Sequence, residues 1–179
     1  MEFGQPFRWI FYPVTGEQIL FCNDRQLRSE VGGAATGTGY GTSNTFYAAY
    51  YRLDTTKTPN IKCGLKNDRF TANDTTIGNG ALTYPIGLLT PDEAALAGMK
   101  AYTSNSTNYL YTNQVWWSFS PYRVNSYGHA YVWRLRVSGD LENYRPNVAC
   151  EVRPGVNLKP NVKASGAGTV DKPYIVKDL

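Results

Sequence analysis

The most informative part of the sequence runs from Val115 to Leu158 and reads VWWSFSPYRVNSYGHAYVWRLRVSGDLENYRPNVACEVRPGVNL. Its two ends carry packing residues, with Trp116 and Trp117 near the start and Val156 and Leu158 at the close. Between these ends, Tyr, Trp and Arg mix with Ser, Gly and Asn in an order that follows no catalytic motif. Large semi-rigid side chains among small adaptable polar ones are typical of antibody paratopes. The stretch therefore predicts a stiff frame that carries a contact surface.

Within this stretch, His129–Val137 (HAYVWRLRV) alternates well enough to predict a strand with one dry face. Trp133 is on the apolar side of that strand, where a core position explains it as well as a contact position does. We expect further strands over Tyr109–Thr112, Val115–Phe119, Asn143–Asn147 and Val152–Leu158, separated by turns at Pro121, Asn125–Gly128 and Ser138–Asp140.

Upstream of Tyr109, short elements alternate with long polar loops. Arg8–Phe21 predicts two short strands around a turn, and Phe46–Leu53 fits either a strand or an amphipathic helix. The clearest helix is predicted over Pro91–Ala97, because Thr90 and Glu93 form a capping box and Gly98 suits the end. The glycine-rich run Gly32–Ser43 lacks the Gly-Lys-Ser/Thr of a phosphate-binding loop and is predicted to be a surface loop.

Length and composition favour a single globular domain over residues 1–179. The aromatic share is 14%, with 14 Tyr against 7 Phe, and Tyr tolerates a wet surface. The net charge of +4 comes without a run of basic residues, so no nucleic-acid surface is indicated. No apolar stretch approaches the roughly 18 residues of a membrane span. Met1–Gln18 lacks the pattern of a signal peptide, so export would use another route or the chain would be a mature or excised fragment.

Three cysteines, Cys22, Cys63 and Cys150, give an odd number. One disulfide with one free thiol and three free thiols are both compatible with that number, and no spacing rule selects between them. The three scattered cysteines and the single histidine form no zinc-binding pattern, and we expect neither a metal nor any other cofactor.

Catalysis is not predicted from the residues. His129, the one histidine, is expected in a strand as an exposed contact residue, and no nucleophile motif accompanies it. Cys150 could in principle pair with His129 as thiolate and imidazolium, but its neighbours carry no nucleophile signature. The chain is therefore interpreted as a binding module and not as an enzyme.

Exposed aromatic and arginine side chains in turns or on a wet strand face need a reason to be there, and ligand contact supplies one. The alternative is that the tyrosines are ordinary core or strand residues. The positions predicted to bind a ligand are Tyr122, Arg123, Asn125, Tyr127, His129, Tyr131, Arg134, Arg136, Asn143, Tyr144, Arg145, Asn147 and Cys150.

A succession of short motifs spans the chain from Phe21 onward: FCNDR (21–25), AAYYRL (48–53), KTPNIKC (57–63), GNGALTYPIGLLTPDE (78–93), WWSFSP (116–121) and VRPGVNL (152–158). This succession resembles a family of bacterial and prophage surface proteins with a C-type-lectin-like domain. Some members of that family are the variable proteins of diversity-generating retroelements.

The resemblance implies an α+β domain of C-type-lectin type, with short helices, small twisted antiparallel sheets and extensive ordered loops. It also implies a variable ligand-binding region over about residues 116–154, diversified at adenines of Asn codons. Asn125, Asn143 and Asn147 fit that origin, and Lys, Gln and Met are absent from Val115 to Leu158. Cys150 would then be a product of diversification.

Three functions follow from the resemblance, in decreasing order of expectation: a variable ligand-binding protein, a non-diversifying adhesin or phage receptor-binding domain, and an enzyme of the formylglycine-generating type. The paired catalytic cysteines of the last have no counterpart here, and the sugar- and calcium-binding signature of calcium-dependent lectins is missing. The expected partner is a protein or glycan on a cell or virion surface, and the expected location is extracellular. Neither nucleic acid nor membrane insertion is expected, and the sequence does not fix the oligomeric state.

Overall fold

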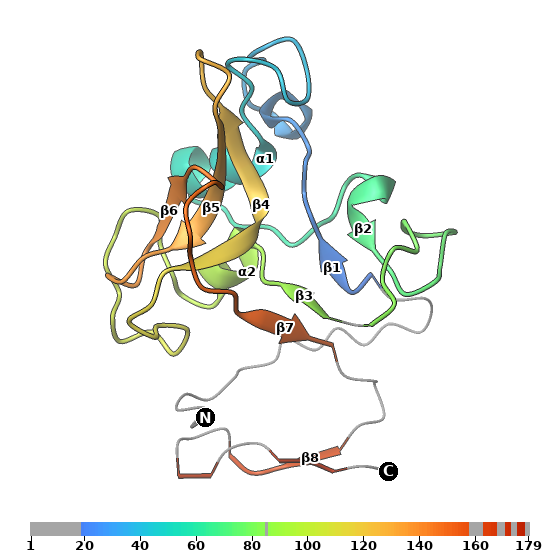
Figure 1. Ribbon diagram of the computed structural model, residues 1–179, viewed down its shortest axis with the longest axis vertical. Coiled ribbons are helices and arrows are strands. Elements are labelled where there is room, and N and C mark those ends of the chain that lie inside the picture. The colour runs from blue at the N-terminus through green and yellow to red at the C-terminus, as the bar shows by residue number, and fades with distance from the viewer. Residues whose placement is uncertain (1–18, 85, 158–162, 168–170, 173–174, 178–179) are drawn as a thin grey trace.

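The computed structural model describes residues 19–84, 86–157, 163–167, 171–172 and 175–177 (Figure 1). It is a mixed α+β structure with short helices, small antiparallel sheets and long connecting loops, as expected at that level of detail. Nearly all of the two strands predicted over Arg8–Phe21 falls outside the described residues.

Among the described residues, the largest sheet has the strand order β4-β5-β6 and comes entirely from the stretch between Val115 and Leu158. Its strands are β4 (Trp116–Val124), β5 (Ala130–Leu135) and β6 (Leu141–Tyr144). The other described strands form two-stranded antiparallel ribbons: β1 (Phe21–Cys22) with β2 (Arg69–Phe70), β3 (Ile86–Leu88) with β7 (Pro154–Val156), and β8 (Lys163–Ser165) with β9 (Ile175–Lys177).

Side-chain alternation gives the main sheet one buried and one partly exposed face. Along β4, every second residue from Trp116 to Val124 is buried. In β5, Trp133 and Leu135 are buried while Arg134 between them is not, which confirms the predicted dry face.

Pro121 does not end a strand, and that prediction was wrong. β4 is the edge strand of its sheet and its pairing with β5 is irregular between Trp117 and Arg123, so the missing proline N–H leaves no gap in a regular ladder. The strand predicted over Tyr109–Thr112 was also wrong, since turn and irregular backbone occupy those positions.

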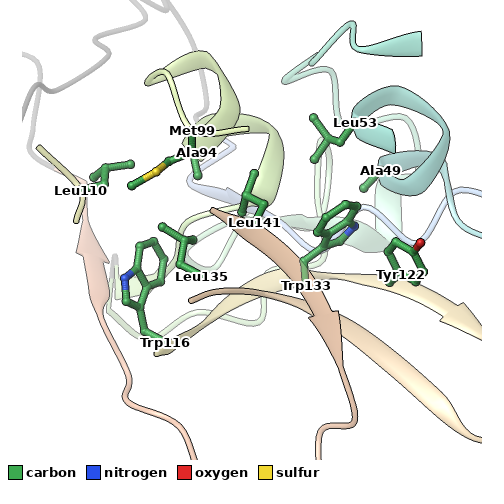
Figure 2. Packing of buried hydrophobic residues seen from close by; sticks show 10 residues of the cluster. All are labelled: Ala49, Leu53, Ala94, Met99, Leu110, Trp116, Tyr122, Trp133, Leu135 and Leu141. Carbon is green, nitrogen blue, oxygen red and sulfur yellow. The ribbon is translucent and has the colours of Figure 1, made fainter. Parts of the chain in front are cut away.

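The buried face of the sheet packs on two short helical segments and forms the main core (Figure 2). One segment is α1 (Ala48–Tyr50), which continues as the π-helical turn η2 (Tyr51–Thr56) and decides the strand-or-helix alternative over Phe46–Leu53 for helix. The other is α2 (Pro91–Leu96). The core cluster consists of Ala49, Leu53, Ala94, Met99, Leu110, Trp116, Tyr122, Trp133, Leu135 and Leu141.

Helix α2 begins as the sequence predicts. The Thr90 Oγ1 accepts a hydrogen bond from the Glu93 backbone N–H at 3.1 Å, and the Glu93 carboxylate accepts one from the Thr90 N–H at 2.7 Å. After the helix, Gly98 has φ of +100°, the left-handed conformation that favours glycine.

The remaining helical turns are 3-10 segments, η1 (Arg28–Val31) and η3 (Lys66–Asp68). Between η1 and α1, residues 32–43 form the predicted surface loop, with several positive-φ glycines.

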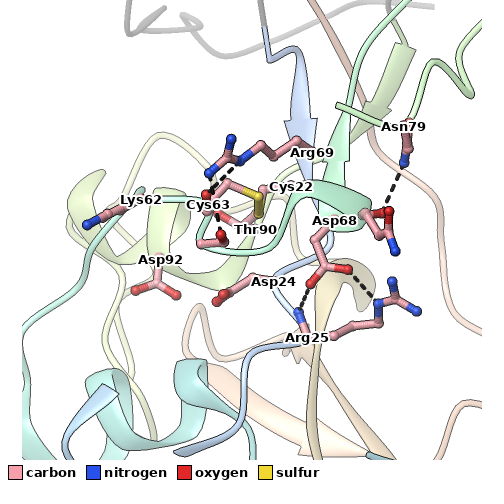
Figure 3. The surroundings of a disulfide bond; sticks show 12 residues. Cys22, Asp24, Arg25, Lys62, Cys63, Asp68, Arg69, Asn79, Thr90 and Asp92 are labelled. Carbon is pink, nitrogen blue, oxygen red and sulfur yellow. Dashed lines mark hydrogen bonds and ion pairs between the residues drawn. A yellow bond between two sulfur atoms is a disulfide. The ribbon is translucent and has the colours of Figure 1, made fainter. Parts of the chain in front are cut away.

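A disulfide between Cys22 and Cys63 joins β1 to the loop before η3 (Figure 3). This bond decides between the alternatives that the sequence left open, and Cys150 is the free thiol. Beside it, the buried Arg52 guanidinium contacts the carboxylates of Asp24 and Asp92, with 2.7 Å from Nη2 to Asp92 Oδ2. These links connect the N-terminal ribbon to η2 and α2, so the elements behind the main sheet are cross-linked.

Candidate ligand-binding surface

The outer face of the main sheet carries a stack of aromatic and arginine side chains. The Arg134 guanidinium lies 3.8 Å from the ring centroid of Tyr144 and 5.9 Å from that of Trp117. Arg134 also donates two hydrogen bonds to Glu142 Oε1, at 2.6 and 2.9 Å. A planar cation stacked on a ring and paired with a carboxylate keeps one geometry, so this part of the face is rigid.

A second group lies at the end of the sheet near the β4–β5 turn. Phe46 pairs with Arg123 through an isolated bridge, and Arg123 is opposite Tyr131 in the β4–β5 register. The Arg123 guanidinium lies 5.6 Å from the Phe46 ring centroid and 5.1 Å from that of Tyr131. The guanidinium of Arg145, the residue after β6, lies 6.0 Å from the centroid of the same Tyr131 ring. We call Phe46, Arg123, Tyr131 and Arg145 the end row.

Electrostatics in the end row are dominated by the two guanidiniums. A hydrogen bond with Arg145, together with the positive charges of Arg145 and Arg123, lowers the pKa of the Tyr131 hydroxyl. Tyr131 is the residue that both cations share.

The side chain of Asn125 stabilises the turn between β4 and β5. Its Oδ1 accepts hydrogen bonds from the backbone N–H groups of Tyr127 and His129, at 3.0 and 2.9 Å. Gly128 has φ of +77°, as a tight turn requires here. Tyr127 is 84% exposed, and its ring lies 6.4 Å from that of His129. The turn therefore presents these two rings to solvent on a fixed backbone.

Tyr122 is not on the surface, and that prediction was wrong. It is only 6% exposed, and its ring packs edge-on against Trp133 with 4.9 Å between centroids (Figure 2). Its hydroxyl donates to Asp54 Oδ2 at 3.0 Å, and burial raises the pKa of that hydroxyl. Because β4 continues through Pro121, Tyr122 keeps the inward alternation that begins at Trp116. Trp133 is fully buried, so the core explanation holds for it.

Asn143 lies at the edge of the sheet and not on the outer face. Its Nδ2 donates to the Tyr102 hydroxyl at 2.6 Å, and the Tyr102 hydroxyl donates to that of Tyr122 at 3.3 Å. Asn143 is thus the outer end of a hydrogen-bonded chain that reaches Tyr122 in the core.

The remaining predicted positions divide between the outer face and exposed loops. Arg136 follows β5 and donates to the Asp140 carboxylate, at 2.6 Å from Nη2 to Oδ2. Cys150 is partly exposed, and its Sγ accepts from Arg134 Nη1 at 3.5 Å. Asn147 is exposed in the turn after β6.

Sequence reasoning missed two contributors to this surface, Trp117 and Phe46, and also Tyr102, the hydrogen-bond partner of Asn143. Trp117 was assigned to packing, although its alternation with the buried Trp116 points outward. Phe46 and Tyr102 come from distant segments and reach the sheet only through isolated pairings and side-chain contacts, for which the sequence carries no local signal.

His129 and Cys150, the two residues considered as base and nucleophile, have different neighbours in the structure. The His129 ring lies 6.4 Å from that of Tyr127, whereas the Cys150 Sγ accepts a hydrogen bond from Arg134. A polar cavity of about 650 Å³ lies beside η2, lined in part by Tyr51, Thr58, Asn60 and Lys62. The described part of the chain holds no group of three or more metal-ligating side chains.

Comparison with known proteins adds nothing to these observations, because no family model, no curated protein and no solved structure matches the chain.

Proposed function

We propose that this chain is a ligand- or receptor-binding protein that displays a diversified surface on a C-type-lectin-like scaffold, as a variable protein of a diversity-generating retroelement does. The outer face of the main sheet, the end row and the β4–β5 turn are its contact surface. The mechanism is recognition alone: aromatic and arginine side chains anchor a partner, and their polar neighbours adapt to it.

One observation carries this proposal. The same three strands bury Trp116, Trp133 and Leu135 on one face and present arginine and tyrosine on the other. Side chains on the outer face can therefore change without loss of the core that holds the backbone. Of the thirteen predicted contact positions, Tyr122 belongs to the hydrophobic core and Asn143 lies at the sheet edge, so both are withdrawn from the contact surface.

The second candidate is a non-diversifying adhesin or phage receptor-binding domain on the same scaffold. It uses the same surface, so the geometry supports the two binding functions equally.

An extracellular, cell-surface or virion location fits the Cys22–Cys63 disulfide, because such bonds persist in oxidising compartments. No helix in the described residues has the length and apolar character needed to span a bilayer. The proposed partner is a protein or glycan on a cell or virion surface.

The DNA that flanks the gene tests the diversification. We expect a reverse transcriptase gene nearby, together with a repeat almost identical to the coding sequence for residues 116–154 that differs from it at adenines. A flank without both features would leave the adhesin as the better candidate. Loss of a thiol-dependent activity in Cys150→Ser would overturn both in favour of an enzyme.

A further inference from the structure

Two arginines at the end of the main sheet have no carboxylate partner among the described residues. Arg123 makes no salt bridge and no side-chain hydrogen bond there, and its Nε is buried without a partner. Arg145 hydrogen-bonds Tyr131 and is exposed. Both lie within 6.0 Å of the Tyr131 ring centroid, so two like charges share one neighbour.

Of the other three arginines of the same stretch, two have carboxylate partners. Arg134 pairs with Glu142, and Arg136 pairs with Asp140. Arg153 donates to the Leu110 backbone oxygen at 2.7 Å. The carboxylates of Glu142 and Asp140 are thus already paired with arginines in or next to β5. The two arginines of the end row keep an uncompensated positive charge.

Aromatic faces hold the Arg123 guanidinium in place without consuming its hydrogen-bonding edge. Phe46 and Tyr131 contact it through their rings, and a ring accepts no strong in-plane hydrogen bond. The N–H groups of a guanidinium match the two oxygens of a carboxylate. A preorganised guanidinium beside a second one suits an anionic group brought by a partner.

We propose that the end row binds carboxylates of an acidic segment on a partner protein, with Arg123 and Arg145 as the two cationic contacts and Tyr131 between them. This inference rests on the proposed binding function and specifies the chemistry of the partner. The end row gives charge selectivity, whereas the Arg134–Tyr144 stack supplies uncharged contact area.

A labelled hexaglutamate peptide is the probe, with hexaglutamine as its neutral counterpart, and binding is measured by fluorescence anisotropy at low ionic strength. We expect the protein to bind hexaglutamate and not hexaglutamine. Arg123→Gln and Arg145→Gln should each weaken binding roughly fivefold or more, because each removes a charge-assisted contact. Lys66→Gln removes the same unit of charge from an exposed site on η3 and should change binding less than about twofold.

Each other outcome overturns a specific statement. Equal weakening by Lys66→Gln and Arg123→Gln would mean attraction by net charge alone, and failure of hexaglutamate to bind would remove the carboxylate site. Tighter binding of a sulfated oligosaccharide, with no hexaglutamate binding, would overturn the assignment to an acidic protein. Weakening by Tyr144→Ala but by neither arginine variant would remove the end row while leaving the proposed contact surface intact. Circular dichroism on every variant verifies that the fold is unchanged.

Discussion

At the scale of single residues, burial and hydrogen bonding separate side chains that look alike in the sequence. Tyr122 and Tyr127 are five positions apart in the same aromatic stretch, yet one is 6% exposed and the other 84%. Tyr122 packs on Trp133 and donates to Asp54, whereas Tyr127 lies in the exposed turn between β4 and β5. Truncation of Tyr122 should therefore reduce the stability of the fold far more than truncation of Tyr127.

Tyr122→Ala should lower the free energy of unfolding by about 3–5 kcal/mol, because it removes a buried ring from the core. Tyr122→Phe keeps the ring and should cost about 1 kcal/mol, the value of the lost hydrogen bond to Asp54. Tyr127→Ala is the matched control and should stay within about 0.5 kcal/mol. Urea denaturation measures all three, and a Tyr122→Ala variant as stable as Tyr127→Ala would refute the core assignment.

Asp140 provides a prediction about pH. Burial acts to raise its pKa, but hydrogen bonds from Arg136 and Ser138 outweigh burial, so the pKa of this carboxyl lies below its usual 3.8. The charged form is thus favoured in the folded state. The stabilisation is complete above the ordinary pKa and is lost as the pH falls through the lowered folded-state pKa.

Asp140→Asn should consequently be less stable than the unmodified chain at pH 7, by about 1–3 kcal/mol. The difference should shrink as the pH falls below the ordinary pKa and then through the lowered folded-state pKa, because the carboxyl is protonated first in the unfolded and then in the folded state. Denaturation midpoints collected between neutral and acidic pH check this. A difference that stays constant over the whole range would mean that the ion pair with Arg136 contributes nothing.

At the scale of elements, the sequence predicts helix caps and strand alternation, which depend on neighbouring residues. It does not predict the extent of a strand that depends on which strands pair. The capping box of α2 and the alternation of β5 depend on neighbouring residues, and both are as predicted. The end of β4 was misplaced because proline normally interrupts a strand, and only the position of β4 at the sheet edge allows Pro121 inside it. That single error assigned Tyr122 to a turn.

Distant contacts explain the rest of what the sequence could not supply. Phe46 reaches Arg123 through one isolated bridge, and Tyr102 reaches Asn143 through one hydrogen bond. No periodic pattern in the sequence predicts either contact. The candidate surface was therefore predicted within the stretch from Val115 to Leu158, and its contributors from earlier segments were not.

Thr90→Ala should destabilise the protein by about 1 kcal/mol, because the Glu93 N–H at the start of α2 loses its acceptor. Thr90→Ser retains a hydroxyl at that position and should recover most of the loss. Thermal unfolding of both variants is the measurement. If serine were no better than alanine, the cap would not be what Thr90 contributes.

At the scale of the whole molecule, the regions behind the main sheet are tied together by covalent and ionic links. The Cys22–Cys63 bond closes a loop with a sequence separation of 41 residues. Arg52 connects η2 to Asp24 and Asp92 from two other segments. Such links keep the backbone in place when surface side chains change.

Replacing both Cys22 and Cys63 by Ser should lower the free energy of unfolding by about 3–4 kcal/mol, because the unfolded chain regains the freedom of that loop. Cys150→Ser is the control and should have little effect, since its thiol is free. Denaturation under non-reducing conditions compares them. Equal stability of the double variant and the control would show that the disulfide is dispensable for the frame.

The most direct test of the central claim compares tolerance to substitution on the two faces of the structure. Two libraries displayed on yeast use the same degenerate codon: one at Arg123, Tyr127, His129, Tyr144, Arg145 and Asn147, the other at Met99, Trp116, Tyr122, Trp133, Leu135 and Leu141. The fraction of clones that resist protease is the measured quantity. An exchangeable surface on a fixed core predicts that most clones of the first library resist and few of the second do. Equal fractions in the two libraries would contradict it.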